Sequence, residues 1–231
     1  WNAWAGPDVL RRKSAILRVI PMNDHGELRL DEYEKLLNSK TKLVAVAHQS
    51  NALGTINDIA SITRMAHAKG ARVLVDGAQS AAHLKVDVKE LDCDFYAVSA
   101  HKICGPTGVG ALYGKAEIMA QMPPYQGGGD MIRSVTFAET TYKGIPGRFE
   151  AGTPAIAQVI GFGAALDYLG ALPWDAVHAH EENLLRYATE KMSQIQGLRV
   201  IGTAANKSAI LSFTLEQVHP HDIGTVMDAE N

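Results

Sequence analysis

Three short, continuously apolar segments constrain this fold more than any other feature of the sequence. They are KLVAVAH (42–48), ARVLVD (71–76) and FYAVSA (95–100). Unbroken apolarity, rather than alternation, is typical of strands that are buried on both faces of a sheet. The segment between the first two, NDIASITRMAHAKG (57–70), has the spacing of an amphipathic helix. A strand, a helix and a strand in this order predict a right-handed crossover in a mostly parallel sheet.

Residues 57–70 also carry the start and stop signals of a helix. Asp58 or its neighbour Asn57 suits the N-cap, and Gly70 suits the C-terminal end. The segment LRVIPM (17–22) is expected to add a further buried strand, because it is again short and apolar. The fold class that follows is α/β, with a mostly parallel central sheet flanked by helices.

Longer helices and short strands are expected in the last third of the chain. The segments lie at residues 156–172, 174–197, 198–202, 208–215 and 219–231. We therefore predict a large domain in residues 1–165, with its N-terminal part missing, and the beginning of a smaller α+β domain in residues 166–231. Because the chain starts at Trp1 and stops at Asn231 inside a helix-like segment, it is expected to be a piece of a longer one.

Composition argues against several classes of function. The 231 residues carry a formal net charge of −3 and no dense basic cluster, which argues against nucleic-acid binding through phosphate contacts. No run of 18 apolar residues predicts a membrane span, and no signal peptide is visible. Cys93 and Cys104 are too few for a disulfide framework and lack the spacing of a metal site. We therefore expect a cytoplasmic protein without nucleic-acid, membrane or metal partners.

Polar residues follow each of the three predicted strands. They occupy positions 48–51, 76–79 and 99–102. Ligands of an open parallel sheet bind at the carboxyl ends of its strands. An acid, an amide, a hydroxyl, a histidine and a lysine are therefore expected to converge on one crevice: Asp76, Gln79, Ser99, His101 and Lys102.

Pyridoxal phosphate is the cofactor whose chemistry fits this set of residues. It needs a lysine for its resting Schiff base, a role for Lys102, and a carboxylate that keeps the pyridine nitrogen protonated, a role for Asp76. Ser99 and His101 are candidates for binding the phosphate group, and Gln79 for the ring oxygen.

Each of these residues also has an ordinary structural explanation. An aspartate after a strand is often a turn residue or a helix N-cap, which would account for Asp76. Lys102 by itself could be a surface lysine, and His101 by itself a structural histidine. The combination at the ends of adjacent strands is what favours a cofactor site.

Two other ligand sites are disfavoured by spacing. In a nucleotide-binding P-loop the lysine follows the last glycine and opens a helix. Here Lys102 precedes the glycines, and a strand, GALYG (110–114), follows them. A metal site at His219 and His221 lacks a carboxylate or cysteine partner with matching spacing.

Several segments together resemble the class V aminotransferase family of fold-type I pyridoxal phosphate enzymes. More narrowly, they resemble the Suf-type, or group II, cysteine desulfurases, also called selenocysteine lyases. The centre of the match is VLVDGAQSAAH (73–83) followed by FYAVSAHKICGPTGVGALYG (95–114). The match extends over nearly the whole chain, through residues 47–58, 123–132, 148–169 and 219–228.

The resemblance implies a role for each candidate at the strand ends. Lys102, Asp76 and His101 would be the catalytic residues, with Lys102 as the Schiff-base lysine and Asp76 as the partner of the pyridine nitrogen. Gln79 would hydrogen-bond the ring hydroxyl oxygen. Ser99 and His101 would bind the phosphate.

Three further roles rest on the resemblance alone. Asn51 would lie near the ring oxygen and the substrate carboxylate. Thr153 would reach the phosphate of the other subunit, which implies a homodimer with shared active sites. Residues 126–132, QGGGDMI, would line the active site, where glycine lets backbone approach closely.

The implied reaction converts L-cysteine or L-selenocysteine into L-alanine. Its sulfur would remain as an enzyme-bound persulfide for a Suf-type acceptor protein and iron–sulfur cluster assembly. The acceptor cysteine would lie downstream of Asn231, and a ring-stacking histidine upstream of Trp1. Cys104 is expected to be small and buried, and Cys93 to lie away from the site, so this chain alone is expected to be inactive. The alternatives are a kynureninase-like or transaminating class V enzyme, and a non-catalytic binding partner with the same fold.

Overall fold

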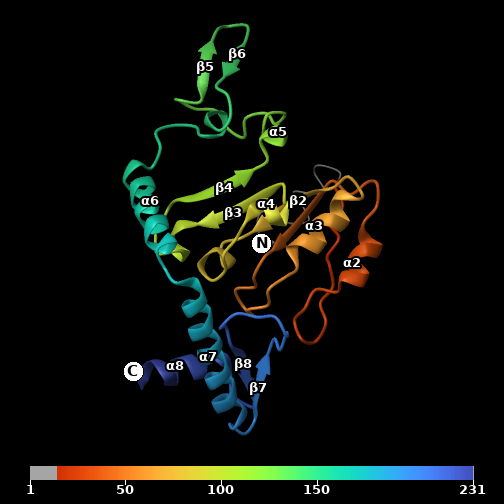
Figure 1. The fold of residues 1–231 in the computed structure, drawn as a ribbon, viewed down its shortest axis with the longest axis vertical. Helices are drawn as coiled ribbons and strands as arrows, with labels where there is room; N and C mark the ends of the chain where they lie inside the picture. The colour runs from red at the N-terminus through yellow and green to blue at the C-terminus, as the bar shows by residue number, and fades with distance from the viewer. Residues whose placement is uncertain (1–14, 231) are drawn as a thin grey trace.

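A four-stranded sheet forms the centre of the larger part of the molecule (Figure 1). The structure, a computed structural model, describes residues 15–230. The strands are β1 (Leu43–Ala47), β2 (Arg72–Asp76), β3 (Phe95–Ser99) and β4 (Gly110–Gly114), in the order β1-β2-β3-β4. The first three are parallel and β4 is antiparallel to β3. The prediction of an α/β fold with a mostly parallel sheet is confirmed.

Helix α3 (Ile59–His67) makes the crossover between β1 and β2. The Asp58 carboxylate accepts a hydrogen bond from the Ser61 amide at 3.0 Å, as expected of an N-cap. Gly70 ends the segment in a left-handed conformation, with φ at 74°. The apolar face of α3 is buried against the sheet, in the cluster that holds the core of the larger part.

Short helical elements precede, connect and follow the strands of the larger part. They are α2 (Leu30–Leu36), η1 (Ser80–Ala82), α4 (Val88–Leu91), η2 (Ala100–Lys102) and α5 (Ala116–Met119). Helix α2 contributes Tyr33 to the core, where its hydroxyl donates to the Ile62 carbonyl oxygen at 3.1 Å.

The strand expected at residues 17–22 is not formed. Only Met22 pairs with another strand-like residue, in an isolated bridge to Leu28. Ile16 and Val19 are 82% and 74% exposed. The prediction was wrong because an apolar segment becomes a strand only where a neighbouring strand supplies hydrogen bonds, and the described residues provide none here.

A buried carboxylate holds the amino ends of β2 and β3 together. Asp94, fully buried, accepts from the Val73 amide at 2.7 Å. Its oxygens also lie 2.8 Å from His67 Nε2 and 3.3 Å from Arg72 Nη1. Cys93 beside it is buried as well, so the expectation that this cysteine lies away from the carboxyl ends of the strands agrees with the structure.

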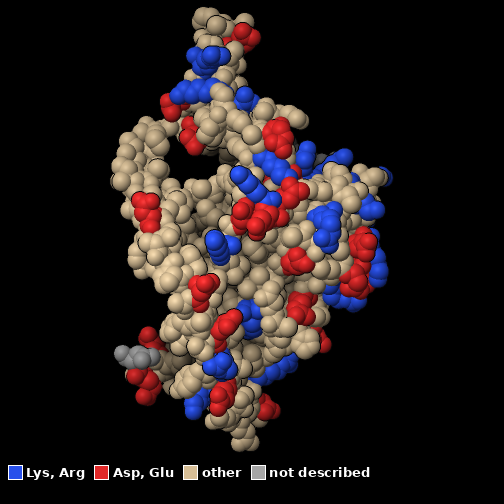
Figure 2. Space-filling view, viewed as in Figure 1, with Lys and Arg blue, Asp and Glu red and all other residues tan. Residues whose placement is uncertain are grey.

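A two-stranded hairpin extends from the sheet at the top of Figure 1. It consists of β5 (Ile132–Val135) and β6 (Thr140–Tyr142), and η3 (Gly147–Phe149) follows it. Helix α6 (Ile156–Gly170) then returns along the side of the sheet. Figure 2 shows positive and negative side chains intermixed over this view of the molecule, while α6, with one charged residue in its sequence, is almost uncharged.

The last third of the chain forms a separate small sheet with two helices. Helix α7 (Trp174–Ser193) precedes the antiparallel pair β7 (Leu198–Ile201) and β8 (Ser212–Leu215), and α8 (Pro220–Ala229) follows. Strand β8 starts four residues later than expected. Residues 208–211 instead contact the loop after β1, where the Ser208 amide donates to the Gly54 carbonyl oxygen at 2.9 Å. The boundary at residues 165 and 166 stays a prediction.

Within residues 15–230, no single helix is long and apolar enough to cross a membrane. Helices α6 and α7 reach the required length and composition only as a pair, across a bend of 84°.

Candidate active site

The carboxyl ends of β1, β2 and β3 lie side by side. In the sheet register Asp76 pairs with Ala47 on one side and with Ala97 on the other. Beyond the strands, the His48 amide donates to the Asp76 carbonyl oxygen at 2.9 Å, and the Gly77 amide donates to the Ala97 carbonyl oxygen at 2.8 Å. Asp76 therefore occupies the middle of the edge where a parallel sheet binds its ligands.

The turn after β2 presents Asp76 and Gln79. One oxygen of the Asp76 carboxylate accepts from the Ala78 amide at 3.0 Å, which closes the turn over its own backbone. Both side chains are half-buried. The turn then continues directly into η1, so the two polar side chains start from a hydrogen-bonded and ordered backbone.

Lys102 lies in η2, immediately after β3. The turn is built around Ala100, which is fully buried and whose carbonyl oxygen accepts from Ile103 at 2.9 Å and from Gly105 at 2.8 Å. A side chain at position 105 would come within 2.9 Å of that same oxygen, which explains the glycine. His101 and Lys102 are consequently exposed, next to Ser99 at the end of the strand.

The expectation that Cys104 is buried was wrong. It is exposed rather than buried, and its φ is 62°. The reason is the tight turn around Ala100, which places this residue in the left-handed region and leaves its side chain outside the core.

Asn51 and Thr153 lie on segments other than the turns after β2 and β3. Asn51 is exposed in the loop that follows β1. Thr153 follows Gly152, whose amide donates to the Gly129 carbonyl oxygen at 2.8 Å. Thr153 and the glycine-rich segment 126–132 thus lie together at the base of the hairpin. One chain brings five of the seven predicted site residues to the edge formed by β2 and β3, and the roles of all seven stay predictions.

Sequence reasoning missed a buried polar cluster behind this edge. The Tyr96 hydroxyl lies 2.7 Å from Ser80 Oγ and 3.0 Å from His48 Nδ1. Burial lowers the pKa of His48 to about 4 and raises the pKa of Tyr96 to about 12, so both groups are uncharged at neutral pH. The signal that could have revealed the cluster is a tyrosine within the continuously apolar segment 95–100, because the hydroxyl of a buried tyrosine needs a polar partner.

The donor set at the edge fits pyridoxal phosphate. An amine on an exposed turn and a carboxylate on the neighbouring strand are the two groups that this cofactor requires. Ser99, His101 and Gln79 add a hydroxyl, an imidazole and an amide for its phosphate and ring oxygens. The chemistry of the residues present therefore matches the cofactor predicted from the sequence.

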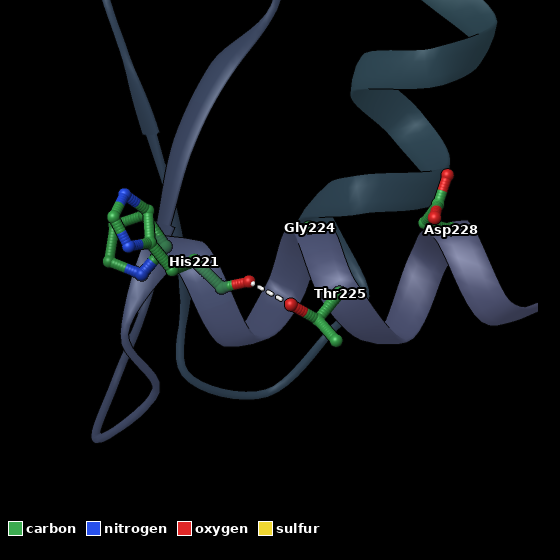
Figure 3. Close-up of a pocket in the computed structure, with 5 residues that line it drawn as sticks. His221, Gly224, Thr225 and Asp228 are labelled. Atoms are coloured by element: carbon green, nitrogen blue, oxygen red, sulfur yellow. Dashed lines mark hydrogen bonds between the residues drawn. The ribbon is translucent and has the colours of Figure 1, made fainter.

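A hollow elsewhere on the molecule carries no comparable set of side chains. It is a shallow, open depression along α8, lined by Pro220, His221, Gly224, Thr225 and Asp228 (Figure 3). The Thr225 hydroxyl in it donates to the His221 carbonyl oxygen of its own helix at 2.9 Å. Among residues 15–230, no group of three His, Cys, Asp or Glu side chains is placed to hold a metal ion.

Comparison with known proteins gives a consistent set of relatives. The profile of the family Aminotransferase class-V matches residues 2–231. A cysteine desulfurase from Synechococcus elongatus is 52% identical over 216 residues, which are 94% of this chain and 34% of that protein.

Solved structures that resemble this chain include a cysteine desulfurase as well. The cysteine desulfurase CsdA from Escherichia coli superposes with a TM-score of 0.93 at 35% identity, covering 99% of this chain and 57% of that one. A lysine-to-alanine variant of C-DES, with glycine covalently linked to its PLP cofactor, superposes with a TM-score of 0.83 at 26% identity, covering 96% and 60%. The chain therefore spans between about a third and three fifths of the length of these relatives.

Proposed function

The chain belongs to the class V aminotransferase family, and on that premise we propose that it is the cofactor-binding part of a Suf-type cysteine desulfurase. One observation carries the proposal beyond the similarity. Asp76 ends β2 and Lys102 follows β3, its neighbour in the parallel sheet, so a carboxylate and an amine flank one edge. These are the two groups without which the cofactor of the family does not work.

Pyridoxal phosphate, when bound, supplies a reactive aldehyde and an electron-withdrawing ring. In the proposed site Lys102 Nζ would hold the cofactor and, as a free amine, would take and return the proton at the substrate Cα. The Asp76 carboxylate would keep the ring nitrogen protonated. Ser99, His101 and, from the second subunit, Thr153 would hold the phosphate.

Gln79 and Asn51 complete the proposed site. Gln79 follows Asp76 in the same turn, so its amide is presented at the same edge and would bind the ring oxygen. Asn51 lies in the loop after β1, on the other side of Asp76, and would contact the ring oxygen and the substrate carboxylate.

The proposed substrate is L-cysteine, with L-selenocysteine as the close analogue. The sulfur atom passes from the substrate to an enzyme thiol, so that L-cysteine and the thiol give L-alanine and a persulfide. We assign this thiol to neither cysteine of the chain. Cys93 is buried at the amino end of β3, and burial raises its pKa to about 11, which opposes formation of the thiolate nucleophile. Cys104 stands two residues from Lys102, where the resemblance assigns no acceptor.

The partners proposed for the complete protein follow from the same family. One is a second copy of the chain, because the family resemblance assigns Thr153 to the phosphate site of the other subunit. The other is a Suf-type protein that accepts the persulfide sulfur for iron–sulfur cluster assembly. A cytoplasmic location is proposed with them, since Cys93 and Cys104 are both free thiols.

Borohydride reduction of the complete gene product tests the assignment of Lys102. Reduction followed by peptide mapping is expected to place the pyridoxyl group on the peptide that contains Ser99 to Lys102. Lys102→Ala is expected to lose L-alanine formation from L-cysteine by about 10²–10⁴-fold, the usual contribution of a proton-transferring group. Lys85→Ala, an exposed lysine beyond η1, is the matched control and is expected to leave the rate unchanged.

Two results would contradict the proposal. A label on another lysine would overturn the site, and a labelled Lys102 with turnover of kynurenine or an amino-group acceptor, but not of L-cysteine, would overturn the reaction.

A further inference from the structure

The ring of Tyr96 supports the backbone of the turn that carries Asp76. Tyr96 lies on β3, opposite Val75 in the register, and is 3% exposed. A Cβ atom at Gly77 would lie only 1.9 Å from Cε1 and 2.3 Å from Cζ of this ring. The glycine is therefore required by the tyrosine. Gly77 is held on one side by the Ala97 carbonyl oxygen, which accepts its amide, and on another by the aromatic ring.

The hydroxyl of the same ring joins the loops that follow β1 and β2. It lies 3.0 Å from His48 Nδ1, after β1, and 2.7 Å from Ser80 Oγ, after β2. The Ser80 hydroxyl in turn donates to the Gly77 carbonyl oxygen at 3.3 Å. All three polar side chains are buried, with exposures of 8% for His48, 0% for Ser80 and 3% for Tyr96.

The donors and acceptors of these three hydrogen bonds can be assigned from the Ser80 hydroxyl. Because Ser80 donates to the Gly77 carbonyl oxygen, its Oγ accepts from the Tyr96 hydroxyl, which leaves the Tyr96 oxygen to accept from His48 Nδ1–H. The chain of donors then runs from His48 through Tyr96 and Ser80 to the backbone of Gly77. Neutral groups in this order strengthen one another, since each donor polarises the next.

The two clamped residues, Gly77 and Ser80, each follow a proposed cofactor ligand. Asp76 precedes Gly77, and Gln79 precedes Ser80, so the two clamped residues each adjoin a residue that would contact the pyridine ring. A small movement of the Gly77 carbonyl would move both side chains. Such displacements at a reacting site are costly, because binding groups act only within narrow distances.

We propose that Tyr96 is a positioning residue, whose hydroxyl, held by His48 and Ser80, fixes the turn that presents Asp76 and Gln79 to the cofactor. The proposal rests on the proposed function for the identity of the ring that Asp76 and Gln79 contact. The geometric evidence for the proposal comes only from the contacts among Tyr96, Gly77, Ser80 and His48.

Tyr96→Phe in the complete gene product tests the proposal, because it removes the hydroxyl and keeps the ring against Gly77. The expected results are an affinity of the apoprotein for pyridoxal phosphate that is about tenfold weaker, as for one lost hydrogen bond, and a shifted pH midpoint of the absorption of the bound cofactor. In turnover, kcat is expected to fall more than KM rises. Ser80→Ala is expected to act in the same direction, and the double variant to be no worse than the stronger single one.

Tyr33→Phe is the matched control. Tyr33 is equally buried and its hydroxyl also donates one hydrogen bond, to the Ile62 carbonyl oxygen, but it lies on α2. Tyr33→Phe is expected to lower the stability of the protein as Tyr96→Phe does. It is expected to leave the affinity for pyridoxal phosphate and the absorption spectrum of the bound cofactor unchanged.

Other outcomes separate this proposal from the proposed function. Equal cofactor affinity and spectrum in the wild type and Tyr96→Phe would overturn the positioning role alone. A wild type that binds the cofactor normally but does not convert L-cysteine would overturn the proposed function, and the affinity of Tyr96→Phe would still decide the role of Tyr96. A wild type that binds no pyridoxal phosphate would overturn both.

Discussion

His83 Nδ1 lies 2.7 Å from Glu181 Oε1, and this contact ties the segment after η1 to helix α7. A second contact strengthens the link, because His178 Nε2 of the same helix lies 2.7 Å from the His83 carbonyl oxygen. His83 follows Gln79 by four residues. The turn that carries the proposed cofactor ligands is therefore attached directly to the last third of the chain.

We expect this contact to stabilise the fold measurably. A double-mutant cycle with His83→Ala and Glu181→Ala is expected to give a coupling of about 1 kcal/mol in urea unfolding, because both side chains are about three quarters buried. Lys35 and Glu32, an ion pair on the surface of α2 at 2.8 Å whose side chains are 67% and 33% exposed, provide the control cycle, in which a coupling below about 0.5 kcal/mol is expected. Equal couplings in both cycles would mean that burial adds nothing to the His83 contact.

Asp76→Asn is expected to retain the cofactor and to lose nearly all turnover. The amide oxygen can still accept from the Ala78 amide, so the turn is kept, while a neutral group no longer holds the ring nitrogen protonated. The cofactor content is measured by absorbance and the rate by L-alanine formation. Asp87→Asn, where an aspartate caps α4, is the control. Wild-type rates in Asp76→Asn would show that this aspartate is a turn residue only.

Asp94→Ala is expected to lower the free energy of unfolding by about 2 to 4 kcal/mol. The change leaves the Val73 amide and the His67 ring without their buried acceptor. The expected loss is smaller than for a fully buried ion pair, because Arg72 is half exposed. Asp92→Asn, which neutralises a carboxylate that is 64% exposed and keeps a residue type that tolerates the left-handed backbone of this position, is expected to cost less than about 1 kcal/mol. Similar losses in the two variants would contradict the importance assigned to burial.

Acid is expected to destabilise the protein through His48. Its pKa is about 4 in the folded state, below the ordinary value of 6.5, because burial disfavours the charged ring. Between these values the unfolded state binds more protons, so stability is fully present above pH 6.5 and falls as the pH drops towards 4, by about 3 kcal/mol.

The measurement compares unfolding of the wild type and His48→Asn at pH 7 and pH 4. The difference in stability between the two proteins is expected to shrink by about that amount, since carboxylates common to both cancel. A difference that is the same at both pH values would show that His48 is not buried in its neutral form.

Much of the larger part of the fold followed from local pattern. The apolar segments at 42–48, 71–76 and 95–100 became β1, β2 and β3. Burial on both faces, which their unbroken apolarity predicted, is not seen in residues 15–230, where β1 alternates between exposed and buried residues and β2 and β3 are only partly buried on their second face. The candidate site followed from the same step, since the carboxyl ends of parallel strands meet at one edge. The sequence therefore placed Asp76 and Lys102 after two strands, β2 and β3, that are adjacent in the sheet, and their shared site stays a prediction.

Tertiary structure decided what depends on a partner distant in the sequence. Residues 17–22 form a short apolar segment, but among residues 15–230 no strand lies beside them. Ser208 and Ile210 contact the loop at Gly54 instead of extending β8. The hydrogen-bonded contact of His48, Ser80 and Tyr96 depends on the segments that follow β1 and β2 and on strand β3 itself. Periodicity reports only how one segment is buried, whereas hydrogen bonds between segments are set by the packing that brings the segments together.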